Sequence, residues 1–447
     1  MNSGKNKFGL GSIVLLGLNG IIGAGIYLLP GKAMALVGPA SMFVHVFLAV
    51  LTLTIALCYA ECAAMFGRNG AAYVYAREAF GGFIGFEVGF LKLITRLTSW
   101  AALTVALLTA LSVYWPGVLH GLPKVVMTLA LLGGLAVVNI LGVRPTEVLN
   151  NTVTVIKLLP LVVIVLFGVF AIEPVHFTPL FPADFSDDKF GAAVLLMFFA
   201  YVGIDNMAMA AEDMKNPEQN LPVAIVAVVV LCCIIYFLVQ AVAVGTLGPA
   251  LADSKVPVAD VAQVLLGPVG RELVSVGAII SILGITVASS FSLPRLAVAL
   301  AQDGLLPRRF ARNGRYGTPG AAIVLCLAVT VPLAITGSFT QLVAINGVVR
   351  FINYLSTCLA VLVMRRREPE RARSFRVPYL YGTALIAMAL IVWILFNASR
   401  FQLLFGAGAL LAVVPLYLLM RWQDRDSGGH GDGSLDRKEG TSGRIMP

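Results

Sequence analysis

The stretch Gly20-Ile21-Ile22-Gly23-Ala24-Gly25-Ile26-Tyr27 lies at the centre of the first hydrophobic segment, which covers roughly residues 11–37. This segment can cross a bilayer with some tilt, because a membrane-spanning helix needs about 20 apolar residues. Glycines at its centre weaken the helix at the depth where unpaired backbone groups are most unfavourable. A second interrupted segment, around Phe198 to Asn206, lies five hydrophobic segments later. Two interrupted spans in corresponding halves of a chain indicate the binding site of a secondary transporter.

The composition predicts a multi-pass membrane protein. Hydrophobic residues make up 59% of the chain and charged residues only 12%, which excludes an ordinary soluble globular domain. No small-residue cleavage site follows the start of the first span, so we expect that span to be a retained helix. Twelve spans are predicted, at roughly 11–37, 41–66, 84–114, 123–143, 152–172, 190–214, 221–247, 272–301, 319–336, 339–364, 378–398 and 401–422.

The basic residues predict the orientation of the spans. With the N-terminus inside, the cytoplasmic loops carry most of the Lys and Arg residues, including the arginine-rich segments at 308–315 and 365–376. Cytoplasmic loops of membrane proteins are enriched in this way. We therefore expect a multi-pass protein of the cell membrane with both termini cytoplasmic. The net charge of +9 then reflects topology, and we expect no nucleic-acid partner because aromatic residues are not interleaved with the basic ones.

The order of the spans predicts one transmembrane domain, residues 1–422, built from two repeats. Repeat one covers about 11–172 and repeat two about 190–364, and each begins with an interrupted span. An odd number of spans per repeat inverts the second repeat, so the two interruptions meet near the midplane. The extra helices lie at 378–422, and the polar tail 423–447 is predicted to be disordered and cytoplasmic. Glycines also allow helices to pack closely, so some glycines of the first span are packing positions.

Several motifs give the chain a family resemblance. They occur in order across about residues 8–420 and lie at Gly20–Tyr27, Tyr59–Phe66, Gly70–Gly81, Glu212–Pro217, Pro294–Arg295 leading to Asp303–Pro307, and Phe375–Pro378. With these motifs the chain resembles the amino acid–polyamine–organocation superfamily. The resemblance implies an all-α membrane protein with the leucine-transporter-type fold. That fold has twelve transmembrane helices, a five-plus-five inverted repeat followed by two helices, and breaks in helices one and six.

The two interruptions supply the candidate substrate site. Backbone N–H groups freed at the first interruption favour a carboxylate, and the carbonyls freed at the second accept hydrogen bonds from an ammonium group. Together they predict a zwitterionic α-amino acid, whereas a polyamine does not need the anion-binding half. The resemblance also implies that Phe199 closes over the ligand, with an ordinary core role as the alternative. The predicted substrate-binding residues are Ile22, Gly23, Ala24, Gly25, Phe199, Ala200, Val202 and Gly203.

Lys157, early in the fifth span, is the most informative charge. A cation within a span is unfavourable by at least ~2.5 kcal/mol on insertion scales and is therefore a candidate functional group. The resemblance implies that a lysine here takes the place of a sodium ion and ties span one to span eight, with Ser289 and Ser290 as its expected partners. Asp205 is a second candidate for ion or proton coupling. Snorkelling of Lys157 to the surface and helix capping by Asp205 are the structural alternatives.

The remaining charges leave the substrate class partly open. Lys92, Arg96 and Arg350 are candidates to contact an acidic substrate side chain, while Glu61 is expected to form an ion pair with a nearby arginine. Ser289 stands where some basic amino acid exchangers of the superfamily carry tryptophan, which weakens an arginine or agmatine assignment. A cationic amino acid or polyamine exchanger remains the alternative. No catalytic motif joins the four scattered histidines, so an enzyme is not favoured, and no cofactor or metal is expected. A channel is less favoured because both halves carry a mid-span interruption.

Overall fold

The computed structural model describes residues 9–65, 72–141, 147–203, 216–312, 314, 317–371, 373 and 375–426. Within this part of the chain the regular structure is entirely helical, without strands. The α-helices are α1 (Leu10–Ile21), α2 (Ala24–Leu28), α3 (Pro30–Val37), α4 (Ser41–Met65), α5 (Ala72–Phe80), α6 (Gly82–Leu111), α7 (Gly121–Ile140), α8 (Glu147–Gly168), α9 (Asp187–Met197), α11 (Pro217–Leu247), α12 (Pro257–Gln302), α13 (Gly320–Thr336), α14 (Phe339–Arg367), α15 (Leu380–Phe396) and α16 (Arg400–Asp426). The short 3₁₀ helices used below are η5 (Phe198–Tyr201) and η7 (Gly248–Asp253).

Helix length and hydropathy support a membrane-spanning protein. Seven helical segments of the described chain are long and apolar enough to cross a bilayer, and three more are shorter but apolar. The long ones exceed the roughly 20 residues that a spanning helix needs. The described residues thus form a helical protein of the multi-pass membrane type.

Local sequence explains where several helices begin and bend. The Ser338 side chain accepts from the Gln341 backbone and the Gln341 side chain accepts from the Ser338 backbone, a capping box that starts α14. The predicted span at 272–301 is the second part of a longer element, because α12 starts at Pro257 and changes direction at Gly267, where φ is +66°. Glycine tolerates this left-handed conformation, and Pro268 follows it. At the other end of the chain, α16 continues to Asp426, past the predicted start of the tail at 423.

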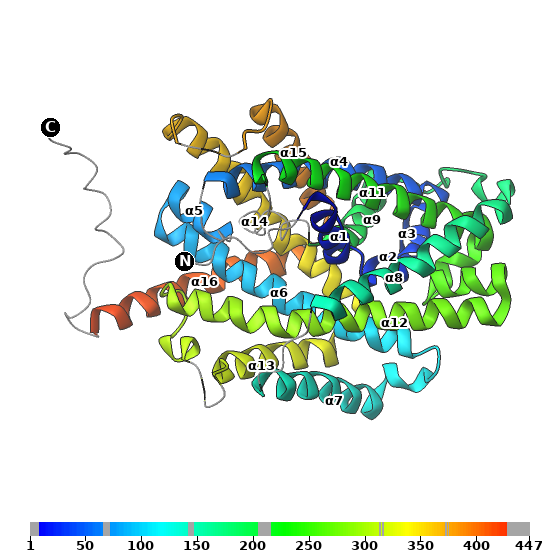
Figure 1. Cartoon of the computed structure of the whole chain (residues 1–447), viewed down its shortest axis with the longest axis horizontal. Coiled ribbons are helices and arrows are strands. Elements are labelled where there is room, and N and C mark those ends of the chain that lie inside the picture. The colour runs from blue at the N-terminus through cyan, green and yellow to red at the C-terminus, as the bar shows by residue number, and fades with distance from the viewer. Residues whose placement is uncertain are drawn as a thin grey trace.

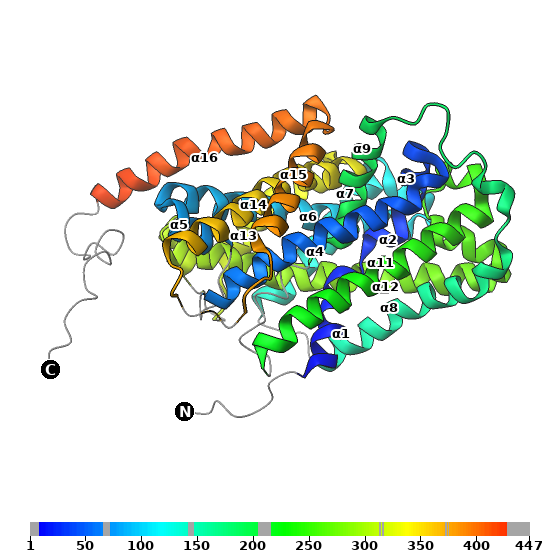
Figure 2. The same ribbon diagram turned by 90° about the horizontal axis from the view of Figure 1, so that it is seen from above.

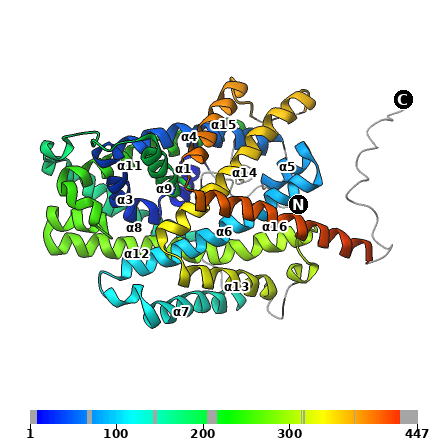
Figure 3. The same ribbon diagram turned by 180° about the vertical axis from the view of Figure 1, so that it is seen from behind.

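Helices of the two predicted repeats lie next to each other in corresponding pairs. α4 lies beside α11, α6 beside α12, and α7 beside α13 (Figures 1 and 3). In each pair, one helix comes from the first half of the described chain and its neighbour from the second. Figure 2 shows α16 at one edge of this assembly and α8 at the opposite edge.

Burial distinguishes the central helices from the outer ones. In the most apolar window of α6, 83% of the residues are buried, against 17% for the corresponding windows of α7 and α16. The exposed residues of α7 include Leu122, Val126, Leu129 and Val137, which suits contact with lipid. α6 therefore forms part of the core against which the interrupted segments pack.

Candidate functional site

The first hydrophobic segment loses its helical conformation at Ile22 and Gly23. α1 ends at Ile21, Ile22 is extended with φ −71° and ψ +107°, and α2 starts at Ala24. α2 and α3 continue each other, because the Leu29 N–H donates to the Gly25 carbonyl and Leu29 accepts from the Ala33 N–H. The backbone at 22–25 therefore lies at the start of an almost continuous helical run to Val37. Residues Ile22, Gly23, Ala24 and Gly25 are all buried.

The second interrupted segment also changes conformation. α9 ends at Met197, the four residues of η5 follow, and Val202 is extended with φ −65° and ψ +133°. Gly203 has φ +119°, a conformation that favours glycine. Asp205 lies outside the residues that the structure describes. Of the predicted residues in this segment, Phe199 and Ala200 are buried and Val202 is half-buried.

The two interruptions touch each other. A Cβ atom added to Gly25 would lie 2.6 Å from the Ala200 Cα, and one added to Gly203 would meet the Gly20 carbonyl. Real Cβ atoms do not approach backbone this closely, so both glycines are required by the contact. The backbone of α1 and α2 thus crosses that of η5 and Gly203 without an intervening side chain. This contact brings together the residues predicted to bind the two ends of the substrate.

Side chains from two other helices satisfy carbonyls freed by the interruptions. The Lys157 ammonium, from α8, donates to the Asn19 carbonyl at 2.5 Å and also to the Asn19 side-chain oxygen. The Tyr236 hydroxyl, from α11, lies 3.1 Å from the Ala200 carbonyl oxygen and 3.4 Å from that of Ile21. The last carbonyls of a helix lack intrahelical partners, which explains why these donors gather here. Neither Asn19 nor Tyr236 was predicted from the sequence, since neither belongs to a recognisable spacing.

Lys157 also contacts the second half of the divided segment. The Tyr27 hydroxyl of α2 donates to the Lys157 carbonyl oxygen at 2.5 Å. Lys157 is itself fully buried, so the alternative of an ammonium that snorkels to the surface does not describe this side chain. Through its ammonium and its carbonyl, Lys157 links α1 and α2 across the interruption.

The partners of Lys157 differ from the prediction. Within the described residues, Lys157 forms hydrogen bonds with Asn19 and Tyr27, and none with Ser289 or Ser290. The Ser290 hydroxyl donates to the Val287 carbonyl of its own helix at 2.7 Å, and its carbonyl accepts from Asn139 at 2.5 Å. Ser289, which precedes Ser290 in the chain, is half-buried.

Helix register gives the reason. α8 and α12 are antiparallel, since a Cβ on Gly168 would lie 3.2 Å from Leu265 and one on Gly277 would lie 2.6 Å from Pro160. Lys157 precedes Pro160 by only about 5 Å of helix, whereas Ser289 follows Gly277 by about 18 Å. The α12 serine nearest the level of Lys157 is Ser281, which is fully buried and whose hydroxyl has no hydrogen-bond partner within the described residues.

α6, α12 and α14 enclose the interruptions. The Trp100 indole donates to the Thr286 carbonyl at 3.1 Å and thereby joins α6 to α12. A Cβ on Gly23 would lie 2.6 Å from the Ile285 side chain, so α12 also abuts the first interruption. Phe199 meets Phe339 of α14 edge to face, with ring centroids 5.8 Å apart. The predicted binding residues of the two interruptions therefore contact α12 at Gly23 and α14 at Phe199.

A polar cluster joins α6 to α14 beside this region. The Asn346 amide donates to the Thr95 carbonyl at 2.6 Å and to the Thr98 and Ser99 hydroxyls. The Arg350 guanidinium donates to Asn346 at 3.2 Å and to Ser99 at 3.1 Å. Arg350, one of the charges considered for an acidic substrate, therefore bonds to groups of the protein itself.

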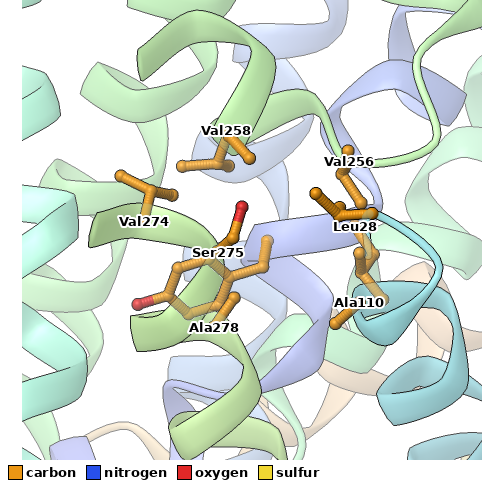
Figure 4. A pocket seen from close by; sticks show the side chains of 10 residues that line it. Leu28, Ala110, Val256, Val258, Val274, Ser275 and Ala278 are labelled. Carbon is orange, nitrogen blue, oxygen red and sulfur yellow. The ribbon is translucent and has the colours of Figure 1, made fainter. Parts of the chain in front are cut away.

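Both ends of the helical assembly carry further features. Towards the far end of α2, a mainly apolar hollow is lined by Leu28, Val258, Val274, Ser275 and Ala278 (Figure 4). At the end of α4, the buried Glu61 carboxylate lies 3.4 Å from Arg365 and 3.6 Å from Arg373 and accepts from the Val377 N–H at 2.7 Å. The predicted ion pair of Glu61 is confirmed.

Comparison with known proteins gives consistent results. A family model described as amino acid permease matches residues 8–417. An uncharacterized transporter of Mycobacterium tuberculosis is 30% identical over 418 residues, covering 87% of this chain and 86% of the relative. The methylthioribose transporter of Bacillus subtilis is 28% identical and covers 86% of this chain and 87% of its own length. The serine/threonine exchanger SteT of the same organism is 29% identical, with 87% and 90% covered.

Proposed function

Because the chain belongs to the amino acid permease family of the amino acid–polyamine–organocation superfamily, we propose that it is a secondary transporter of α-amino acids. It moves neutral amino acids by preference across the cell membrane by alternating access. Its resemblance to the serine/threonine exchanger favours neutral substrates over cationic ones. A cationic amino acid or polyamine exchanger is the alternative, and an enzyme or a channel is less favoured.

The proposed architecture has twelve transmembrane helices, with a five-plus-five inverted repeat and two further helices. The pairing of α4 with α11, α6 with α12 and α7 with α13 supports it, because each pair joins corresponding spans of the two repeats. The connections between the second and third spans of each repeat also correspond. α5 lies between α4 and α6, and the first part of α12, up to Gly267, follows α11 in the same way. In an inverted repeat these connections lie on opposite sides of the membrane. Twelve spans place both termini on one side, and the arginine-rich loops favour the cytoplasmic side.

The contact between Gly25 and Ala200 carries the functional proposal. It packs the start of α2 against η5, and we propose that the N–H groups of the first and the carbonyls of the second serve one buried site. A carboxylate binds at the N–H groups of Ile22 to Gly25. An ammonium binds at the carbonyls of Phe199, Ala200 and Val202, with Gly203 allowing their orientation. An α-amino acid presents both charges at a short separation.

Lys157 takes the place of a coupling ion in this proposal. Its ammonium lies on the Asn19 carbonyl, where a bound cation would otherwise be needed to offset the freed carbonyls. Transport is then independent of sodium, and Lys157 or Asp205 is the group that would carry a proton. Ser281 replaces Ser289 and Ser290 as the proposed contact on α12, because of its level along the helix and its unpartnered hydroxyl.

Substrate counterflow in proteoliposomes tests this function. Proteoliposomes that contain the purified chain are loaded with unlabelled amino acid. The entry of labelled amino acid into the vesicles is then measured in the presence of external competitors. A methyl ester, an N-acetyl derivative and a diamine of the preferred amino acid should each compete at least tenfold less well than the parent. Equal competition by the ester or the diamine would show that two-ended recognition is wrong. Methylthioribose, which lacks both charged groups, is the matched competitor suggested by the relative that transports it.

A further inference from the structure

The segment from the end of α14 to the start of α15 carries an unusual concentration of arginine. It contains six arginines between positions 365 and 376, together with Glu368 and Glu370. Figure 1 shows the end of α14 beside the start of α15. On the orientation proposed above, this segment lies at the cytoplasmic surface of the membrane, so the inference below rests on that part of the proposed function.

The arginines fall into two groups by their contacts. Arg365 and Arg373 lie on the buried Glu61, and Arg371 lies 2.7 Å from Glu368. These three are therefore paired with carboxylates, and Arg365 and Arg373 share one of them. Their charges hold the segment against α4 and stabilise its local turn.

The second group consists of Arg366, Arg367 and Arg376, which are exposed. Arg367 donates to the Ala79 carbonyl at 3.0 Å, and Arg376 donates to the Pro369 carbonyl at 3.5 Å. Within the described residues, none of these three guanidiniums forms an ion pair with a carboxylate. Carbonyls do not neutralise a cation, so the surface here keeps a local positive charge.

One tyrosine lies beside these cations, and a second precedes it by two residues in the chain. The Arg366 guanidinium lies 5.7 Å from the centre of the Tyr381 ring, in the first turn of α15. Tyr379 is 92% exposed and has a left-handed backbone with φ +53°. That conformation is unfavourable for a bulky side chain. Tyr379 also occupies the position before α15 without capping it through its side chain, which leaves the first N–H groups of that helix open to an anion.

The surface continues directly into apolar residues. Leu385 and Ile386, one turn further along α15, are 59% and 50% exposed. Tyrosine is enriched where protein meets the membrane–water boundary, and clusters of arginine beside a spanning helix attract anionic lipids. A soluble anionic partner would not need the apolar continuation, whereas a phospholipid has both a phosphate and acyl chains.

We propose that Arg366, Arg376, Tyr379 and the open start of α15 form a binding site for the headgroup of an anionic phospholipid. The phosphate lies at the guanidiniums and at the first N–H groups of α15, and the acyl chains follow Leu385 and Ile386. Arginines in a cytoplasmic loop can also serve only to orient the protein in the membrane. Arginines with that role alone would not distinguish one lipid from another, so selectivity among lipids separates a binding site from an orientation signal.

The test measures binding of short-chain lipids to the purified full chain in neutral detergent. Dioctanoyl phosphatidylglycerol is compared with dioctanoyl phosphatidylcholine and with glycerol 3-phosphate, by native mass spectrometry and thermal stabilisation. We expect phosphatidylglycerol to bind at least tenfold more tightly than either of the other two. The double substitution Arg366→Gln and Arg376→Gln should reduce this preference to within twofold. Arg371→Gln, a matched change in the same segment at a paired arginine, should keep it.

Tyr379→Gly provides an independent arm because it removes the ring and the unfavourable backbone conformation together. We expect weaker binding of phosphatidylglycerol with an unchanged or higher melting temperature. Equal binding of both lipids by the unmutated chain, or an unchanged preference in the double variant, would overturn the proposal. Tight binding of glycerol 3-phosphate would show that the site takes a soluble phosphate instead. None of these measurements uses transport, so a failed counterflow experiment would leave this result standing, and the converse also holds.

Discussion

The ammonium of Lys157 donates a hydrogen bond to the backbone carbonyl of Asn19 at 2.5 Å, and this bond joins α8 to the end of α1. Asn19 is among the last residues of α1, where helix carbonyls are open to donors from other elements. A buried cation and a freed carbonyl therefore offset each other at the point where the first span is divided. This relationship connects an intramembrane charge to the proposed substrate site.

Replacing Lys157 should impair transport while sodium has no effect on the unmutated protein. Lys157→Met removes the donor and with it the hydrogen bond to the Asn19 carbonyl, a loss of about 1–3 kcal/mol for a buried charged donor. We expect counterflow to fall at least tenfold. The matched control is Lys124→Met, because Lys124 donates to the Gly337 carbonyl at 3.1 Å, in a different part of the fold. A steep dependence of wild-type uptake on sodium would contradict the proposed role whatever the variants do.

Proton coupling can be separated from the fixed-cation role with Lys157→Arg. Arginine remains charged at any accessible pH, whereas lysine can release a proton. We expect an inside-alkaline gradient to accelerate uptake by the unmutated chain and to have no such effect on this variant. Counterflow, which needs no net proton movement, provides the control for correct folding. Absence of a response in the unmutated chain would remove the coupling by Lys157 and leave its structural link intact.

Gly25 should tolerate no side chain at all. A side chain here would crowd the proposed carboxylate site, and it would also collide with η5, because a Cβ would lie 2.6 Å from the Ala200 Cα. Both Gly25→Ala and Gly25→Val should therefore reduce counterflow to background while the protein still inserts. Gly134→Ala in α7 is the matched control, because nothing lies within 4 Å of its added Cβ. Normal transport by Gly25→Ala would show that the transport cycle does not need the close contact between Gly25 and Ala200.

Glu61 should contribute strongly to stability. Glu61→Gln removes the buried carboxylate that faces Arg365 and Arg373, and the Arg373 side chain is only 1% exposed. Breaking a buried pair in this way is unfavourable by about 3 kcal/mol or more, so we expect the melting temperature in detergent to fall by several degrees. Glu368→Gln affects the exposed pair with Arg371 and should change stability by less than about 1 kcal/mol. Equal shifts in the two variants would contradict the assignment.

The sequence predicted the features that depend on local composition. The divided first segment follows from glycines at its centre, and the family resemblance, confirmed by the match over residues 8–417, follows from motifs in order. The partners of Lys157 could not be predicted, because they depend on how far two packed helices slide along each other. Ser281 and Ser289 lie eight residues apart along α12, about 12 Å of helix. Asn19 and Tyr236 were not predicted, because their bonds depend on which carbonyls the two interruptions bring within reach of α8 and α11.

Tyr236 allows a direct test of the ammonium end of the site. Its hydroxyl lies 3.1 Å from the Ala200 carbonyl and 3.4 Å from that of Ile21, so one proton is shared between the two interruptions. Tyr236→Phe keeps the ring and removes the donor, which leaves both carbonyls less well oriented. We expect the preference for an amino acid over the same acid without its amino group to fall about tenfold, equivalent to one buried hydrogen bond.

The control for this variant is Tyr114→Phe, which removes a hydroxyl bonded to Glu272 at 2.5 Å at the far end of α6. A purely structural role for Tyr236 would weaken the amino acid and its deaminated analogue equally, because both share the carboxylate end. A selective loss for the amino acid therefore assigns the Tyr236 hydroxyl to the orientation of the ammonium-binding carbonyls. An equal loss for both ligands would restrict Tyr236 to holding the two segments together.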